Sequence, residues 1–383
     1  MRTHAGQLQR GITFAGLAAL LFGVTAPLLK RASAGVGTFF AGSLVYLGAA
    51  LAAALIASLR APSPQHPAVL RGSRGRLGLV ALLGAVIAPA LLVAGLRRTD
   101  GATASLLLAL EAPFTIGLAR VLLREFVGAR VTAAALLITV GAAVLVGTSL
   151  ASGSTVLGVG LVSGAALAWS LDNLLSRALA DLDPLQVVSA KGFLGAAMSG
   201  VVAAAARDVA PPLANALALL LLGAFGYGVS LQLYLRAQHI VGAARTASIF
   251  ATAPFFGVAV AFIAGSPWLG VAFPVAAVLI AAGVALHLSE RHEHPHRHDA
   301  IDHEHMHDHD DGHHGHAHDM MPRAPHSHRH SHTAMSHAHA HSEDLHHRHQ
   351  HGSGGETKAE EKADEKALEK ALEKALEKMH RHT

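Results

Sequence analysis

The sequence predicts an all-α membrane protein with ten transmembrane helices, arranged as two inverted five-helix repeats, and a disordered histidine-rich tail. Of its 383 residues, 51% are hydrophobic and only 15% are charged, a balance too apolar for an ordinary soluble protein. The sequence after Glu290 is polar, so the apolar residues are concentrated before it. Residues 101–114 (GATASLLLALEAPF) return as residues 242–255 (GAARTASIFATAPF), which indicates a duplication.

The apolar runs have the length of transmembrane helices. A hydrocarbon core about 30 Å thick requires about 20 apolar residues per helix, and these runs lack the alternation of barrel strands. The first run is followed by Lys30-Arg31 and not by small residues, so we interpret it as a span and not as a signal peptide. The predicted spans are 10–29, 36–59, 77–96, 102–122, 131–149, 156–178, 185–206, 213–235, 243–264 and 268–288.

The duplication determines the predicted topology. The motif LLGA at 82–85 also returns at 221–224, so the repeat extends through both halves. Each half holds an odd number of spans, and the second half therefore enters the membrane inverted relative to the first. Lys and Arg are more frequent in the loops on the side of the N-terminus, which predicts that both termini are cytoplasmic.

We expect four segments along the chain. The first five-helix repeat covers 1–150 and the second covers 151–290. The histidine-rich tail covers 291–355, and a helix rich in Ala, Leu, Glu and Lys covers 356–383. A glycine-serine joint before this helix leaves open whether the helix is native.

Several features together resemble the drug/metabolite transporter superfamily, EamA type. They are the five-plus-five arrangement, the small residues 101–105 that lead to Glu-Ala-Pro at 111–113, the Arg124-Glu125 turn, and Gly141 and Gly283 in the closing spans. The turn has no acidic counterpart in the second half, where Gly-Ser-Pro stands at 265–267.

The resemblance implies a multi-pass carrier of the bacterial inner membrane that exports amino acids or other small metabolites by alternating access. Its expected partners are the lipid bilayer and a small-molecule substrate, with no catalysis and no required cofactor. A homodimer is left open. The formal charge of +4 is spread over loops and tail, and it does not predict nucleic-acid binding.

Helix-breaking residues occur at matched positions in the two halves, where transporters place their binding sites. Pro89 and Gly228 correspond in the third and eighth spans, and Pro113 and Pro254 correspond in the fourth and ninth. Proline removes a backbone donor, and glycine allows a ligand to approach the backbone closely. We expect these four residues to line a cavity; the alternative is that they kink helices or permit tight helix contacts.

Glu111 lies near the centre of its predicted span. A charged side chain at the bilayer centre costs about 2.5–3.5 kcal/mol. Because desolvation favours the protonated form of a carboxyl group, Glu111 is predicted to exchange a proton or to hold a cationic group. The alternative is a hydrogen-bonded contact between helices. The second half has Thr252 at this position.

A second set of polar residues lies in the sixth to eighth spans. Asp172 and Lys191 are at similar depths in adjacent antiparallel spans, so we predict that they pair. The pair either stabilises the fold or contacts the substrate. Trp169, Asn173 and Tyr227 add groups of the kind that orient an organic solute in an apolar cavity.

Most of the 29 histidines of the chain lie in the tail, often at every second position. Imidazole groups interleaved with carboxylates predict binding of Zn²⁺, Ni²⁺, Co²⁺ or Cu²⁺ without one fixed geometry. The tail would then deliver metal to a pore, sense metal or pH, or buffer metal passively. The candidate ligands are His292, His294, His296, His298, His303, His305, His307, His309, His313, His314, His316 and His318.

Two alternatives to a metabolite exporter remain at this point. The first is a divalent metal efflux carrier of the same fold, fed with Ni²⁺, Co²⁺ or Zn²⁺ by the tail. The second is a membrane sensor that transports nothing.

Overall fold

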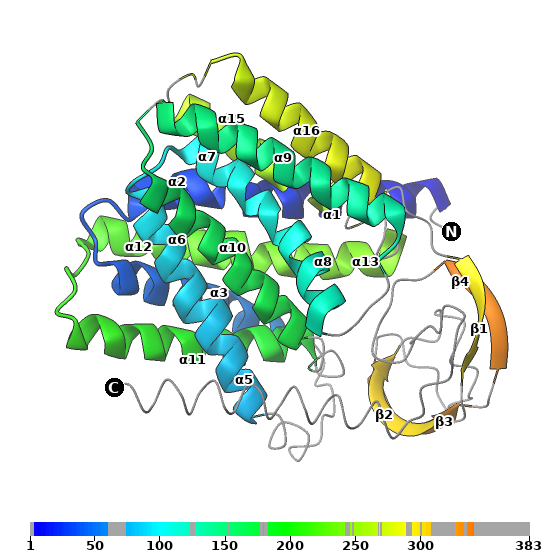
Figure 1. The fold of residues 1–383 in the computed structure, drawn as a ribbon. Helices are drawn as coiled ribbons and strands as arrows, with labels where there is room; N and C mark the ends of the chain where they lie inside the picture. The colour runs from blue at the N-terminus through cyan, green and yellow to red at the C-terminus, as the bar shows by residue number, and fades with distance from the viewer. Residues whose placement is uncertain are drawn as a thin grey trace.

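The computed structural model describes residues 4–59, 74–122, 127–151, 153–176, 179, 183–241, 246, 249–266, 268, 270–288, 293–298, 301–307, 326–332 and 335–340. Up to residue 288 the regular elements are all helices, and they pack into one bundle (Figure 1). The helices in the first half are α1 His4–Gly23, α2 Thr25–Ala32, α3 Thr38–Ser58, α5 Arg74–Ala81, α6 Ala88–Leu96, α7 Gly101–Leu107, α8 Glu111–Leu122 and α9 Ala129–Ala151. Those in the second half are α10 Val156–Ser176, α11 Pro184–Ala205, α12 Leu213–Gly223, α13 Ser230–Val241, α15 Ala253–Ile263 and α16 Ala272–Leu288.

Eight stretches of the described chain are long and apolar enough to cross a membrane, and they define a multi-pass membrane protein. They are Leu8–Ala32, Thr38–Ser58, Gly75–Leu96, Gly101–Leu122, Ala129–Ala151, Val156–Ser176, Leu185–Ala205 and Leu213–Ala237. These stretches agree with the first eight predicted spans.

The last two predicted spans are described only in part, and they are not confirmed. Over 243–264 and 268–288 the described helices α15 and α16 are apolar but shorter than these eight stretches. Pro254 lies in the first turn of α15, a position that suits proline because its missing N–H has no partner there. Gly270, with a φ of 76°, lies just before α16. The ten-span prediction is therefore confirmed for eight spans only.

Several spans are interrupted by non-α turns. A π-helical turn, η1 (Leu82–Ile87), lies between α5 and α6, and a second, η4 (Ala224–Val229), lies between α12 and α13. A 3₁₀ turn, η2 (Leu108–Leu110), separates α7 from α8. Short π-helical segments within α-helices frequently mark functional sites.

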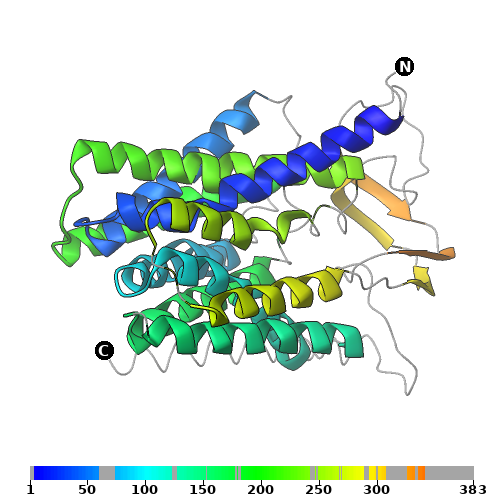
Figure 2. The ribbon, with the colours of Figure 1, turned by 90° about the horizontal axis from the view of Figure 1, so that it is seen from above.

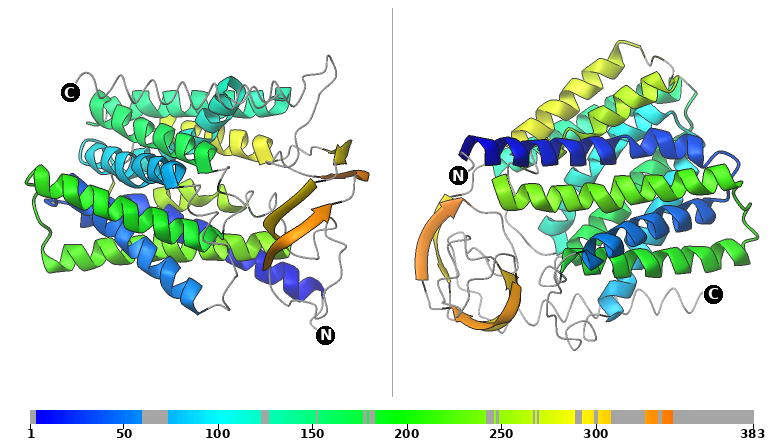
Figure 3. Two further views of the ribbon diagram at one scale, coloured as in Figure 1. Left: turned by 90° about the horizontal axis from the view of Figure 1, so that it is seen from below. Right: turned by 180° about the vertical axis from the view of Figure 1, so that it is seen from behind.

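The most extensive helix pairings join the first half of the chain to the second. Helix α9 packs on α16, α3 on α11, and α7 on α15. Helix α1 packs on α13, and α6 packs on α10. Figure 2 shows α9 and α16 side by side, and the right-hand view of Figure 3 shows α1 beside α13. Neither half could therefore keep its apolar faces buried without the other.

Two glycines make the closest contact between α9 and α16. A Cβ atom on Gly141 would lie 2.8 Å from Cγ1 of Ile280, and one on Gly283 would lie 2.7 Å from Cγ1 of Ile138. Each glycine thus receives the isoleucine of the facing helix. Small residues of this kind let membrane helices approach closely.

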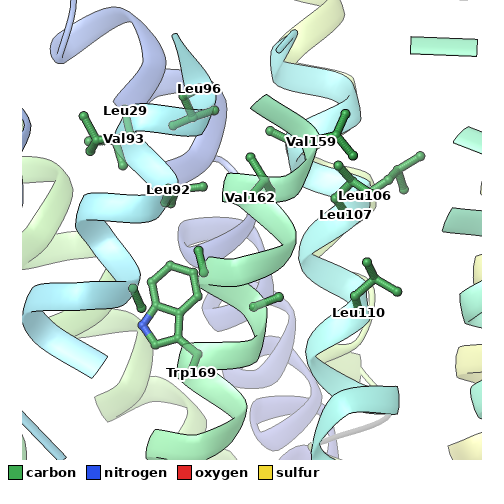
Figure 4. Packing of buried hydrophobic residues seen from close by; sticks show 14 of the residues in the cluster. Leu29, Leu92, Val93, Leu96, Leu106, Leu107, Leu110, Val159, Val162 and Trp169 are labelled. Carbon is green, nitrogen blue, oxygen red and sulfur yellow. The ribbon is translucent and has the colours of Figure 1, made fainter. Parts of the chain in front are cut away.

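Part of the apolar core lies between α6, α7 and α10. Figure 4 shows Leu92 and Leu96 of α6 facing Val162 of α10, with Leu106 of α7 on the other side. Trp169 follows further along α10, at the edge of this core. The core ends where the polar side chains of α10 begin.

The tail contains four short strands, drawn to one side of the helices in Figure 1. Strand β1 (Glu293–His298) pairs antiparallel with β4 (Met335–Ala340), and β2 (Ile301–His307) pairs antiparallel with β3 (His326–His332). The expectation of a disordered tail stays a prediction, because these strands cover only short parts of residues 291–355. Their alternating sequence has the two-residue period of an extended strand. The helix predicted over 356–383 lies outside the described residues.

Candidate functional site

The polar centre of the bundle lies around the Gly84 carbonyl in the third span, which lacks the donor of the π-helical bond within its own helix. In η1 the N–H of Ala88 donates to the carbonyl of Leu83, five residues earlier. The next bond of that register would run from residue 89 to Gly84, but residue 89 is proline and has no N–H. The carbonyl oxygen of Gly84 is therefore free to accept from other helices.

Two aromatic side chains donate to this oxygen. Nε1 of Trp169, on α10, lies 3.0 Å from it, and the hydroxyl of Tyr46, on α3, also donates to it. Trp169 Nε1 also lies 3.3 Å from the Tyr46 hydroxyl oxygen. Pro89 thus creates an acceptor that joins three helices, which explains why all these polar groups can be buried.

The predicted contact between Asp172 and Lys191 is present. The ammonium group of Lys191, on α11, donates to Oδ2 of Asp172 on α10, and the two side chains are 17% and 3% exposed. The pair packs directly on η1, because a Cβ atom on Gly84 would lie 2.2 Å from Oδ2 of Asp172. Only glycine fits at position 84 beside this ion pair.

Glu111 lies on the other side of α10. It begins α8 directly after η2, and it is half-buried. Nδ2 of Asn173 donates to Oε1 of Glu111 at 2.6 Å. The hydroxyl of Ser170 lies 2.9 Å from the Glu111 carbonyl oxygen, so both the backbone and the carboxyl group of Glu111 are held by α10.

Side chains of α10 therefore contact the polar residues of all the neighbouring helices in this centre. Trp169 contacts η1 and α3, Ser170 and Asn173 contact Glu111, and Asp172 contacts α11. We call the set Tyr46, Glu111, Trp169, Asp172, Asn173 and Lys191 the α10 cluster. It offers a carboxyl group with an amide beside it, and an ion pair next to two aromatic rings.

Aromatic rings extend from this cluster toward the first span. The rings of Tyr46 and Tyr227 are 5.7 Å apart, and so are those of Tyr227 and Phe22. Tyr227 and Pro254 line an interior cavity of about 20 Å³, together with Thr25 and Ser105. A cavity of that volume can hold about one water molecule, so this conformation is closed around it.

The helix-breaking residues predicted as a group lie in different surroundings. Pro254 reaches the interior cavity, and Pro89 acts through the Gly84 carbonyl. Gly228 instead allows η4 to approach α3, because a Cβ atom there would lie 2.7 Å from Cβ of Ala52. Pro113 lies in the first turn of α8, two residues after Glu111. Their role in transport stays a prediction.

Two members of this centre were not predicted from the sequence, namely Tyr46 and the carbonyl of Gly84. Tyr46 is one of three tyrosines in the chain and stands in an otherwise apolar run. Gly84 lies five residues before Pro89, which is the spacing of a π-helical bond. Both features can be seen in the sequence, but they predict a contact only if the helix forms a π-helical turn at this point.

Gln232, on α13, has a buried side-chain amide without hydrogen-bond partners among the described residues. It is 3% exposed, and neither its oxygen nor its nitrogen has a hydrogen-bond partner in the described part of the chain. An unsatisfied buried polar group costs about 1–3 kcal/mol. We therefore expect Gln232→Met to raise the thermal stability of the purified protein in detergent.

Ser230 on the same helix is the matched comparison. Its hydroxyl donates to the carbonyl of Ala18 at 2.9 Å, so Ser230→Ala should lower stability by about 1 kcal/mol. A loss of stability in both variants would contradict the assignment of Gln232 as unpartnered.

The predicted metal ligands of the tail are only partly covered by the structure. His294, His296, His298, His303, His305 and His307 lie in β1 and β2. His292, His309, His313, His314, His316 and His318 lie outside the described residues. Within the described residues there is no group of three or more His, Cys, Asp or Glu arranged to hold a metal ion.

A multi-pass helical domain with broken helices around a polar cluster is typical of membrane transporters. The chain belongs to the EamA-like transporter family, which it matches over residues 9–147 and again over 156–289. The same family pattern thus matches twice in succession.

One similar protein is named as a transporter, and one solved structure shares the fold. An uncharacterized transporter of Methanothermobacter thermautotrophicus (strain ATCC 29096 / DSM 1053 / JCM 10044 / NBRC 100330 / Delta H) is 31% identical over 191 residues, which cover 48% of this chain and 56% of that protein. The chain therefore spans little more than half of this relative. A protein of known crystal structure shares the fold with a TM-score of 0.54 and 21% identity, covering 73% of this chain and 98% of that one.

Proposed function

We propose that the protein exports amino acids or other small metabolites across the bacterial inner membrane by alternating access. The observation that carries this proposal is the α10 cluster, in which Glu111 and Asn173 form a polar pair beside Trp169. A carboxyl group next to an amide suits the ammonium group of an amino acid, and the indole ring suits an apolar side chain.

The helix pairings support an inverted-repeat architecture for this transporter. Numbered by span, the fifth packs on the tenth, the second on the seventh and the fourth on the ninth. The first packs on the eighth, and the third packs on the sixth. Exchanging the two halves turns this set of pairings into itself, as a pseudo-two-fold axis requires. Transporters of this type bind substrate where the repeats meet.

The basic residues at one end of the bundle are compatible with cytoplasmic termini. Lys30, Arg31 and Arg97 lie on the side that we assign to the outside, where an excess of Lys and Arg is not expected. Each of them donates to a backbone carbonyl, of Thr99, Ala264 and Val36 respectively. These three cations therefore satisfy loop and helix-end carbonyls, so they carry little information about orientation.

A metal efflux function is not favoured. The family and the Methanothermobacter relative are described only as transporters. In the α10 cluster the carboxylate of Asp172 is neutralised by Lys191, so only Glu111 remains to face a divalent ion. We propose instead that the tail binds Zn²⁺, Ni²⁺, Co²⁺ or Cu²⁺ in the cytoplasm and regulates the carrier.

A thermal-shift screen of amino acids and small metabolites on the full-length protein tests this proposal. A solute present at about 100 times its dissociation constant should stabilise the fold by about 2.7 kcal/mol. Cells that express the protein should then release that solute faster than control cells. A chain truncated after Ser289 should retain this export.

The other outcomes separate the alternatives. Loss of tolerance to Ni²⁺, Co²⁺ or Zn²⁺ on truncation, with normal membrane insertion and no solute export, would favour metal efflux. If no solute stabilises the protein and no release changes, a sensor that transports nothing becomes the better explanation.

A further inference from the structure

A groove runs along the surface of the bundle between α2 and α12, and no member of the α10 cluster lines it. Its volume is about 670 Å³, and apolar side chains form most of its lining. Figure 1 shows α2 and α12 next to each other, and the two helices are in contact. Sites that hold organic ligands have volumes of about 300–1,000 Å³.

Small residues form part of the lining of this groove. Ala214 and Ala218 are one turn apart on α12, and Ala32 lies opposite on α2. Larger apolar side chains, Leu221 and Phe225, also line the groove and are exposed. The small residues leave space that a leucine or phenylalanine in their place would fill.

The two ends of the groove differ in polarity. Arg31 and Asn215 line one end, and Phe225 and Gly226 line the other. At the apolar end a Cβ atom on Gly226 would lie 2.3 Å from Oγ1 of Thr25, so α2 and η4 touch there. From Ala214 to Gly226 the helix rises about 18 Å, which is close to half of a hydrocarbon core about 30 Å thick.

We propose that this groove binds a phospholipid from the membrane leaflet on the Arg31 side, with an acyl chain between α2 and α12 and the phosphate at Arg31. One guanidinium nitrogen of Arg31 donates to the carbonyl of Ala264, and its remaining N–H donors, which have no partner among the described residues, can bind a phosphate. An apolar channel one leaflet deep with a cation at its outer end matches an amphiphile. A free anion would leave the apolar part of the groove unused.

The groove lies close enough to the interior cavity for a bound lipid to act on the residues that line the cavity. Thr25 lies between the groove and the interior cavity, because it contacts Gly226 and also lines the cavity with Tyr227. An acyl chain that ends at Gly226 would press on Thr25, whose side chain contacts Gly226. The lipid would thereby stabilise the closed arrangement of the first and eighth spans.

Native mass spectrometry of the full-length protein, titrated with phosphatidylglycerol, tests the proposal. We expect one lipid that is retained at higher collision energy than the others. Arg31→Gln should weaken its binding by about fivefold, since a basic residue at a membrane surface contributes about 1 kcal/mol to anionic-lipid binding. Ala218→Phe, which fills the groove, should abolish it.

Two variants serve as controls. Arg98→Gln removes another exposed cation at the same end, whose side chain donates to the Ala94 carbonyl of its own helix at 3.0 Å. Val278→Phe adds the same ring to an exposed apolar position on α16. Neither should change lipid retention. Ala214→Phe replaces Ala218→Phe if the latter does not fold.

Unchanged retention in Arg31→Gln and in the filled variants would overturn the proposal, as would equal losses in the controls. Glycerol phosphate should not displace the lipid. Displacement by glycerol phosphate at concentrations comparable to the lipid would mean that the site recognises a free anion and not an acyl chain.

Discussion

Asp172→Asn is expected to lower the free energy of unfolding by about 3 kcal/mol, because it leaves the ammonium group of Lys191 without its partner inside the bundle. Lys191→Met should be at least as damaging, since the Asp172 side chain is only 3% exposed. Its other polar neighbour is the Ser176 hydroxyl, at 3.5 Å. Reversible unfolding of the purified protein in mixed micelles measures both changes.

The double variant, with Asp172→Asn and Lys191→Met together, should be more stable than either single variant. Replacing a buried ion pair by neutral residues often costs little, because both charges lose their desolvation penalty. The double-mutant cycle then gives an interaction energy of at least about 1 kcal/mol. Additive losses would argue against the pairing.

Asp183→Asn is a suitable control for the removal of a negative charge. Asp183 caps α11, the helix of Lys191, by accepting from the N–H of Leu185 at 2.8 Å. Asparagine caps a helix about as well as aspartate, so this variant should keep its stability. A large loss here would mean that net charge, and not the ion pair, sets the stability.

The ion pair also shows what the sequence can predict. Asp172 and Lys191 could be paired because two charges at equal depth in adjacent antiparallel helices have few other ways to be buried. The first eight spans were predicted from the lengths of their apolar runs. The depth argument depends only on counting residues from the ends of regular helices.

That argument fails where the helices stop being regular. The link between Trp169 and the third span depends on a π-helical turn that moves the missing bond of Pro89 from residue 85 to Gly84. The turn at 251–252 that precedes α15 could not be predicted either, because residues 243–264 are mostly apolar and suggest one continuous span. The hydrophobicity of a sequence does not show where a helix changes its hydrogen-bond register or breaks.

Glu111→Gln is expected to reduce coupled transport at least tenfold while expression and folding stay normal. Glutamine keeps the shape of the side chain and an oxygen that can accept from Nδ2 of Asn173, as Oε1 of Glu111 does now. It cannot carry a negative charge or exchange a proton. Uptake of the identified solute into everted vesicles, measured at several pH values, gives the effect.

Two neighbouring changes separate the charge from the local structure. Thr115→Val removes a hydroxyl that donates to the Glu111 backbone carbonyl at 2.8 Å, and it leaves the carboxyl group untouched. It should transport normally. Asn173→Ala removes the donor to the carboxyl group and should cause a partial loss with an altered pH profile.

The position of Glu111 makes a purely structural role costly. Thr252 occupies the corresponding place in the second half, so the carboxyl group has no symmetry-related substitute. A membrane helix that accepts an unsatisfied charge loses about 2.5–3.5 kcal/mol, and Asn173 alone, itself exposed, is a modest compensation. A residue kept only to join α8 to α10 could be glutamine at lower cost. Unchanged uptake by Glu111→Gln across the pH range would therefore remove Glu111 from the mechanism and leave it as a helix contact.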